Sequence, residues 1–321
     1  MKLGVLTVPL SGQPIEKAFE YLAGLGVQSV EIGTGGYPGN AHLDPVAALQ
    51  DPSIIENIKT HLSKYNLTIS ALSCHGNPVH PNKEARDKYR ADFDNTCKVA
   101  EKLGVDTVIT FSGCPGDHPG AKNPNWVTCA WPPEYLDILK YQWEDELIPY
   151  WKSAAETAEK HGVTKTALEM HPGFCVYNPR TLLQLREAVG PIIGANFDPS
   201  HLFWQGINPV EAIKVMKDAI HHFHAKDTRV DYYNAAINGT LETTRYDDFV
   251  GRGWVFRTVG YGNGETVWRD IISTLRAVGY DGAISIEHED GLMSIEEGLE
   301  KAVAFLKPIL MYEPPAVMWW A

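Results

Sequence analysis

Residues 284–290 read ISIEHED, a short apolar run typical of a buried β-strand that ends in four ionisable side chains. A strand that is buried on both faces gathers charge at its end only where that charge has a partner or a chemical role. The same arrangement recurs in ALEMHPG (167–173), NFDPSH (196–201) and HFHAKD (222–227). The chain therefore repeats one structural unit, a strand with ionisable residues at its carboxyl end.

Strand-like and helix-like segments alternate along the whole chain. The helix-like segments carry apolar residues three and four positions apart, and several end in a glycine that returns the chain to the next strand. Strands are expected at 3–8, 29–34, 68–74, 106–113, 166–170, 194–198, 220–227 and 282–289. Eight such repeats in 321 residues favour a single (β/α)8 TIM barrel over residues 1–310 rather than an open sheet. No GxGxxG motif follows the first strand, which disfavours a dinucleotide-binding fold.

Two connections are too long to be simple turns, and both follow strands. They would therefore lie at the C-terminal face of the barrel, where long ordered loops usually cover a site. Their aromatic side chains are costly to leave in water, so we expect the loops to form a lid or a pocket wall. The connections are 114–134, with Trp126 and Trp131, and 228–265, with Trp254 and Phe256.

The composition limits the partners and the location of the protein. A formal net charge of −12 argues against a nucleic-acid-binding surface. The five cysteines have no CxxC spacing, so free thiols in a reducing compartment are expected. The first residues lack the apolar run of a signal peptide, and no run approaches the roughly 18 residues of a membrane span. We therefore expect a cytoplasmic protein that binds neither nucleic acid nor membrane.

Four ionisable residues are expected to converge at the mouth of the barrel. Glu169, Asp198, His224 and Glu287 each end one of four consecutive strands. Three carboxylates placed this close would repel one another unless a cation lay between them. Three carboxylates and one imidazole suit a divalent metal, with Mn²⁺ foremost and Mg²⁺, Co²⁺ or Zn²⁺ as alternatives.

At these residues the sequence resembles the xylose-isomerase-like TIM-barrel superfamily, on the motifs ALEMHPG, NFDPSH, HFHAKD and ISIEHED. This superfamily contains sugar isomerases, ketose 3-epimerases, inosose dehydratases, endonuclease IV and the metal-binding subunit of C-glycoside deglycosidases. The resemblance implies one divalent metal held by Glu169, Asp198, His224 and Glu287. It also implies that Glu169 and Glu287 act as the catalytic acid and base.

Four further residues are expected to contact the substrate. His201 and Arg229 match positions that contact substrate oxygens in the ketose epimerases. His75 ends the third strand, where some relatives place a substrate ligand, and His171 follows Glu169 by two residues. For His75 the alternative is a structural hydrogen bond, and for His171 it is a cap on the turn.

The resemblance implies a sugar isomerase or epimerase that removes a proton next to the carbonyl of a ketose or keto-sugar, through a metal-stabilised enediolate. One alternative is a lyase that eliminates a leaving group from an inosose or a 3-keto-glycoside. Another is a sugar-binding barrel without catalysis. DNA repair is disfavoured, because the fourth strand ends in FSGCPG without the ligands of further metals.

Two features leave the substrate and the assembly open. The stretch GYGNGE (260–265) precedes a helix and, with Arg252 and Arg257 nearby, could cradle a phosphate, although it is not a P-loop and a flexible barrel loop is the more frequent explanation. The apolar tail at 311–321 ends in Met318, Trp319 and Trp320, and such residues rarely remain in water. We expect the tail to form a homo-oligomer contact, with a small second subunit as the alternative.

Overall fold

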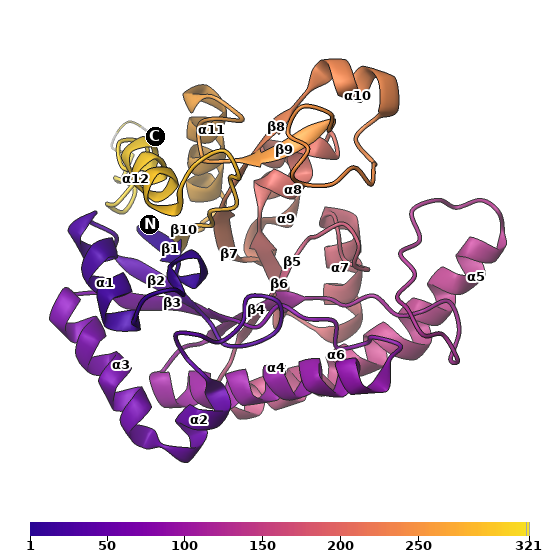
Figure 1. Cartoon of the computed structure of the whole chain (residues 1–321), viewed down its shortest axis with the longest axis horizontal. Helices are drawn as coiled ribbons and strands as arrows, with labels where there is room; N and C mark the ends of the chain where they lie inside the picture. Colours follow the sequence, from indigo (N-terminus) through magenta and orange to yellow (C-terminus); the bar gives the residue numbers. More distant parts are fainter. Residues whose placement is uncertain (319, 321) are drawn as a thin grey trace.

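The computed structural model describes residues 1–318 and 320, and eight parallel strands form a closed barrel at its centre (Figure 1). The order around the ring is β1-β10-β7-β6-β5-β4-β3-β2, and β2 pairs with β1 to close it. The strands are β1 (Lys2–Leu6), β2 (Ser29–Gly33), β3 (Thr68–Ser73), β4 (Thr107–Phe111), β5 (Lys165–Glu169), β6 (Ile193–Phe197), β7 (Ile220–Ala225) and β10 (Ala283–Ile286). The predicted TIM barrel is confirmed, and each predicted strand contains or overlaps an observed one.

Helices surround the barrel and separate its strands. They are α1 (Ile15–Gly24), α2 (Pro45–Gln50), α3 (Pro52–Tyr65), α4 (Lys83–Leu103), α6 (Ile148–Lys160), α7 (Pro179–Val189), α8 (Pro199–Trp204), α9 (Pro209–Met216), α11 (Glu265–Ala277) and α12 (Ile295–Leu306). Their ends follow local chemistry. Asn178 and Thr181 form a capping box at the start of α7. Gly104 ends α4 in the left-handed conformation, with φ of 71°.

The hydrophobic core lies mainly between the barrel and the helices. Trp151, Trp268, Phe93 and Phe19 are among its largest fully buried side chains. Inside the barrel, a small separate cluster of Ala71, Ile109 and Ala167 fills the space between β3, β4 and β5. The apolar filling of the barrel is therefore limited, and ionisable side chains occupy much of the remaining interior.

The strand register places the polar residues at matching heights. Glu169 pairs with Asn196 across β5 and β6, and His224 pairs with Ser285 across β7 and β10. Side chains alternate along a strand, so His222, His224 and Lys226 share the inner face of the β7 segment. All three are buried.

Both long connections contain secondary structure. The connection after β7 holds an antiparallel pair, β8 (Asp227–Val230) with β9 (Trp254–Arg257), and the helix α10 (Tyr232–Asn238). The connection after β4 leads into α5 (Glu134–Tyr141) and a π-helix, η2 (Gln142–Leu147). Trp254 is buried as expected, but Trp131 is 74% exposed, so the expectation that it packs over a site is wrong.

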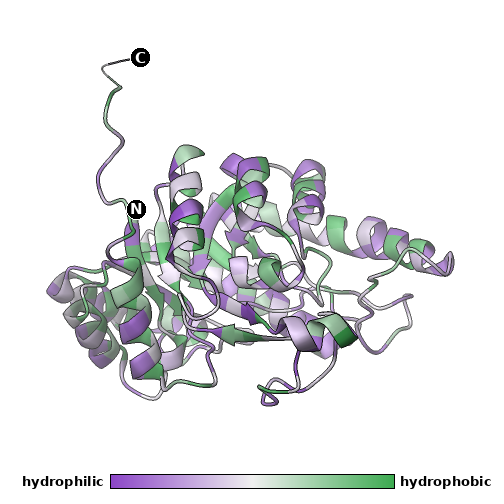
Figure 2. Cartoon of the chain, turned by 90° about the horizontal axis from the view of Figure 1, so that it is seen from above, coloured by the Kyte–Doolittle hydropathy of each residue, from purple (hydrophilic) through white to green (hydrophobic). Residues whose placement is uncertain are grey.

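The tail after α12 leaves the body of the protein (Figure 2). Val317 and Met318 are exposed, and Trp319 and Ala321 lie outside the described residues. The expected oligomer contact of the tail stays a prediction. All five cysteines are free, as predicted. Among the described residues, no helix combines the length and the apolar character that crossing a membrane requires.

Candidate metal centre

The four predicted ligands meet at the carboxyl end of the barrel. Glu169 is the last residue of β5, Asp198 follows β6 as the N-cap of α8, His224 lies on β7, and Glu287 follows β10. One ligand atom from each residue lies within 4.8 Å of those of the other three. They converge because β5, β6, β7 and β10 are neighbours in the ring.

Glu169 is fixed by three hydrogen bonds. His75 and His201 donate from Nε2 to its two carboxylate oxygens, each at 3.0 Å, and Asn196 donates at 3.2 Å. Burial alone would raise the pKa of Glu169, but the neighbouring imidazoles of His201, His224 and His75 hold it well below the usual range. Glu169 is therefore an oriented carboxylate that is ionised at neutral pH.

His171 lies beside this group without contacting the carboxylates through a hydrogen bond. Its ring centroid lies 4.2 Å from that of His201 and 5.0 Å from that of Phe111. Burial lowers the pKa of His171 to about 3, so the ring is neutral. Its Nδ1 contacts the backbone oxygen of Pro172 at 2.5 Å, which fits the turn-capping alternative, and substrate contact stays a prediction.

Lys226 lies in the centre of the site, although sequence reasoning did not assign it there. Its Nζ lies 3.1 Å from Asp198, 2.8 Å from Glu287 and 3.0 Å from Glu289. Burial would lower the pKa of Lys226, but the nearby carboxylates of Asp198, Glu287 and Glu289 raise it well above its usual value. The signal was available in the sequence, because Lys226 shares a strand face with His224.

His224 connects the site to a second buried carboxylate beneath it. Its Nε2 donates to Glu31 at 2.8 Å, while its Nδ1 lies 3.0 Å from Glu287 and 3.5 Å from Glu169. Glu31 also accepts hydrogen bonds from Ser73 and Ser285. Burial opposes ionisation of Glu31, yet His224 and its other partners lower the pKa of Glu31 to about 2.

A second group, formed by Glu31, His222 and His224, also brings ligand atoms within 4.8 Å of one another. Both nitrogens of His222 already have partners, Asn196 at 3.0 Å and Ser70 at 3.2 Å. His224 belongs to both groups, and its Nε2 is bonded to Glu31. This lower group therefore serves better as support for the four-residue group than as a separate metal site.

The four-residue group fits a divalent cation. Within the described chain, buried Asp198 Oδ2 has no hydrogen bond of good geometry, although Lys226 Nζ lies 3.1 Å and His201 Nε2 3.3 Å from it. A buried carboxylate oxygen without a hydrogen bond is costly unless a cation satisfies it. Nε2 of His224 is bonded to Glu31, and its Nδ1 faces Glu287 and Glu169, so Nδ1 is the nitrogen that would hold a cation, as in a carboxylate–histidine–metal arrangement. The donor set does not identify the metal.

A pocket of about 210 Å³ opens above these residues. Its lining mixes apolar or aromatic side chains with ionisable ones. The apolar and aromatic residues are Leu6, Val8, Tyr37, Pro38 and Phe111. The ionisable residues are His75, Glu169, His171, Lys226, Glu287 and Glu289.

Arg229 and the glycine-rich loop, which the sequence linked to the substrate, have other surroundings in the structure. Arg229 is exposed on β8 and does not line this pocket, so its contact with substrate stays a prediction. The backbone N–H groups of Gly260, Gly262 and Asn263 all donate to Asp227 Oδ2, at 2.9 to 3.1 Å. The glycine-rich loop therefore directs these donors to its own carboxylate and not to a phosphate.

These features agree with the comparisons with known proteins. A family model described as "Xylose isomerase-like TIM barrel" matches residues 19–309, and the chain belongs to this family. A Bacillus subtilis (strain 168) relative, the uncharacterized protein YfiH, is 43% identical over 309 residues, which cover 96% of this chain and 98% of YfiH. The resemblance inferred from the motifs is thereby confirmed.

Solved structures share the fold at low sequence identity. The IOLI protein with a binding zinc atom has a TM-score of 0.67 at 18% identity, covering 97% of this chain and 98% of that one. The probable 3-DHS dehydratase AsbF from Bacillus anthracis has a TM-score of 0.67 at 16% identity, covering 95% and 98%. D-psicose 3-epimerase from Clostridium cellulolyticum H10, crystallised with D-tagatose, has a TM-score of 0.61 at 15% identity, covering 96% and 98%.

Proposed function

We propose that the protein is a metal-dependent sugar isomerase or epimerase that acts on a ketose or keto-sugar. The observation that carries this proposal is the pair Glu169 and Glu287, two carboxylates beside His224 Nδ1 at the wall of a small pocket. The divalent cation, Mn²⁺ in our proposal, would be held by Glu169, Asp198, His224 and Glu287. When bound, it polarises the substrate carbonyl and stabilises the enediolate.

The carboxylates of the site supply the proton transfer. Neighbouring imidazoles keep Glu169 ionised, and Lys226 and His224 keep the pKa of the partly buried Glu287 well below its usual range. Either carboxylate can therefore accept a proton from the carbon next to the carbonyl. Isomerisation needs one carboxylate to move a proton between adjacent carbons, whereas epimerisation needs the second carboxylate to return it from the other face.

The pocket supports a small free sugar more than a bulky glycoside. Its volume of about 210 Å³ lies below the range of roughly 300 to 1,000 Å³ that is usual for drug-sized ligands. His75 and His171 line it and could contact sugar hydroxyl groups. His201, which donates to Glu169, would then act mainly by orienting that carboxylate.

Elimination from a keto-sugar is the second candidate, and Lys226 is the observation that favours it. The charged Nζ lies 2.8 Å from Glu287, and the side chain lines the pocket. A protonated lysine there could donate a proton to a departing oxygen after Glu169 or Glu287 has removed the proton next to the carbonyl. Both candidates share the first step and differ in the fate of the enediolate.

Deuterium uptake distinguishes the two. The Mn²⁺-loaded protein is incubated in D₂O with free ketoses, inososes and 3-keto-glycosides, and the products are followed by NMR and mass spectrometry. Deuterium next to the carbonyl with a new epimer or isomer supports the first proposal. Release of water or an aglycone with an unsaturated product supports elimination. If none of these substrates exchanges a proton or releases a leaving group, both candidate functions are overturned.

Substitution of the two carboxylates tests the site itself. Glu169→Gln and Glu287→Gln are each expected to lower deuterium exchange by at least about 100-fold, because positioned acid–base groups contribute about 10²- to 10⁴-fold. Glu300→Gln, on the exposed surface of α12, is the control and should exchange at the wild-type rate. Wild-type exchange in either site variant would rule out this mechanism.

A further inference from the structure

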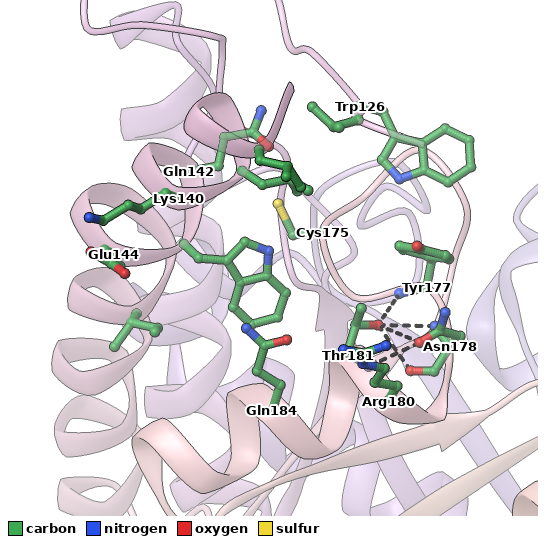
Figure 3. Close-up of a pocket in the computed structure, with 15 residues that line it drawn as sticks. Trp126, Lys140, Gln142, Glu144, Cys175, Tyr177, Asn178, Arg180, Thr181 and Gln184 are labelled. Carbon is green, nitrogen blue, oxygen red and sulfur yellow. Dashed lines mark hydrogen bonds between the residues drawn. The ribbon is translucent and has the colours of Figure 1, made fainter. Parts of the chain in front are cut away.

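A second cavity, of about 540 Å³, is lined mainly by residues of α5, η2, the start of α7 and the loop after β4 (Figure 3). None of its lining residues lines the pocket above the metal centre. Its volume falls in the range of roughly 300 to 1,000 Å³ that is typical of small-molecule sites. The proposed sugar chemistry makes no use of it.

The walls of this second cavity are fixed by specific contacts. Gln142 donates hydrogen bonds to the backbone oxygens of Pro115, Gly116 and Asn125, at 3.3, 3.1 and 2.6 Å, and so holds the loop that carries Trp126. On the opposite wall, the capping box at Asn178 fixes the first turn of α7. The cavity is thus built from ordered segments and does not depend on loose packing.

Its lining combines aromatic rings with polar groups that lack partners. The rings of Trp126 and Tyr177 meet edge to face, with centroids 5.4 Å apart and an interplanar angle of 86°. Trp126 Nε1 is shielded from solvent, and within the described chain no oxygen or nitrogen accepts its hydrogen. A buried indole N–H normally has an acceptor, so the Trp126 side chain would have to turn before a ligand atom reaches this group.

Arg180 supplies a positive charge on the same side of the cavity. Figure 3 shows it below Tyr177, whereas Lys140 lies with Glu144 on the other side. Arg180 is exposed, and across residues 1–318 and 320 its side chain forms neither an ion pair nor a hydrogen bond. An exposed guanidinium that lines a cavity together with aromatic side chains can bind a carboxylate through two hydrogen bonds.

We propose that this second cavity binds a small aromatic carboxylate. The ring of the ligand packs against Trp126 and Tyr177, and its carboxylate pairs with Arg180. This site is independent of the sugar chemistry, so binding tests it directly and turnover is not needed.

The test is an NMR titration of the ¹⁵N-labelled, Mg²⁺-loaded full chain with 4-hydroxybenzoate. The indole resonance of Trp126, identified by its loss in Trp126→Phe, should shift and saturate. Charge and ring are tested separately with 4-hydroxybenzamide and cyclohexanecarboxylate. Each is expected to bind at least about 5-fold more weakly, because the first lacks the charge-assisted pair and the second lacks the aromatic packing. Equal affinity for all three compounds would overturn the proposal.

Three variants locate the binding. Arg180→Gln is expected to weaken 4-hydroxybenzoate at least about 10-fold, because it removes the charge-assisted pair. Lys160→Gln, at the far end of α6, is the matched surface control and should bind like wild type. Asp198→Asn should also bind like wild type, because Asp198 belongs to the metal centre. Loss of binding in Asp198→Asn, or an undiminished affinity in Arg180→Gln, would place the ligand elsewhere and overturn the proposal.

Discussion

Glu31 accepts a hydrogen bond of 2.8 Å from Nε2 of His224, on the edge of the imidazole opposite Glu287. This bond fixes the tautomer that leaves Nδ1 available to a cation. Glu31→Gln should therefore weaken metal binding about 10- to 100-fold, as is typical for groups that orient a metal ligand. Competition with a chelating dye measures the change, and Glu20→Gln on the surface of α1 is the control. Equal affinities in wild type and Glu31→Gln would show that this bond does not matter to the cation.

Asp198 should determine whether metal stabilises the fold. A ligand present at about 100 times its Kd stabilises the folded state by about 2.7 kcal/mol, so Mn²⁺ should raise the Tm of the wild-type protein by several degrees. Asp198→Asn should lose most of this increase, because it removes one charged ligand from a group of four. Thermal unfolding with and without chelator measures both. An undiminished increase in the variant would place the cation elsewhere.

Lys226 is expected to oppose metal binding while it stabilises the metal-free protein. Its ammonium lies within 3.1 Å of both Asp198 and Glu287, so it partly neutralises the carboxylates that would hold the cation. Removing one partner of a buried ion pair costs about 3 to 5 kcal/mol, so Lys226→Met should lower the stability of the chelated protein. The same variant should gain more stability from Mn²⁺ than wild type does. A smaller gain would contradict this account.

The His221 side chain should make the stability of the folded protein sensitive to acid. Burial lowers the pKa of His221 from 6.5 to about 4, and its Nδ1 has no hydrogen-bond partner within the described chain. The unfolded state therefore binds a proton between pH 6.5 and about pH 4 while the folded state does not, so stability falls as the pH falls through this window. The loss amounts to about 3 kcal/mol.

His221→Gln should remove this part of the pH dependence. Urea unfolding of wild type and variant at pH 7 and pH 4.5, both with chelator, gives the difference, because the other titrating groups cancel. The stability difference between the two proteins should move in favour of the variant at the lower pH. Parallel stability curves would contradict the lowered pKa.

Gly36 holds the chain close to His75. It has φ of 65°, and a Cβ atom added to it would lie 1.8 Å from the backbone oxygen of His75. Gly36→Ala should therefore destabilise the protein by several kcal/mol and disturb the pocket wall, as measured by urea unfolding. Gly24→Ala is the matched control, because an added Cβ there meets no atom within 4 Å and alanine favours the helix. Similar stability of the two variants would refute the steric argument.

The sequence was sufficient to predict the barrel and the four residues that converge in it. Strand and helix periodicity are local properties, and consecutive parallel strands place their ends together, so Glu169, Asp198, His224 and Glu287 could be grouped without coordinates. The contact between Glu31 and His224 could not be predicted in this way. It joins residues 193 positions apart on β2 and β7, which are not neighbours in the ring, and it exists only because the barrel closes.

The role of Lys226 was missed for a different reason. Its face of the strand was predicted correctly, but a lysine near three carboxylates is usually a surface partner, and its burial depends on the segment after β8. The ring of Phe256, on β9, lies 4.7 Å from Lys226 Nζ and shields it. In the sequence, residues 228–265 were interpreted as a long loop, because the antiparallel strands β8 and β9 are only four residues each.

The antiparallel pairing of β8 with β9 joins the two ends of the segment between these strands. Val230 lies opposite Trp254, so the segment between them, which contains α10, begins and ends at paired residues. This segment forms a module whose base is the β8–β9 pair. The residues that line the pocket above the metal centre all lie outside this module, so insertions or deletions beyond its base would leave His224 and Glu287 in place. The module could therefore vary in length among homologues, or be redesigned in the laboratory, while the residues of the barrel site stay the same.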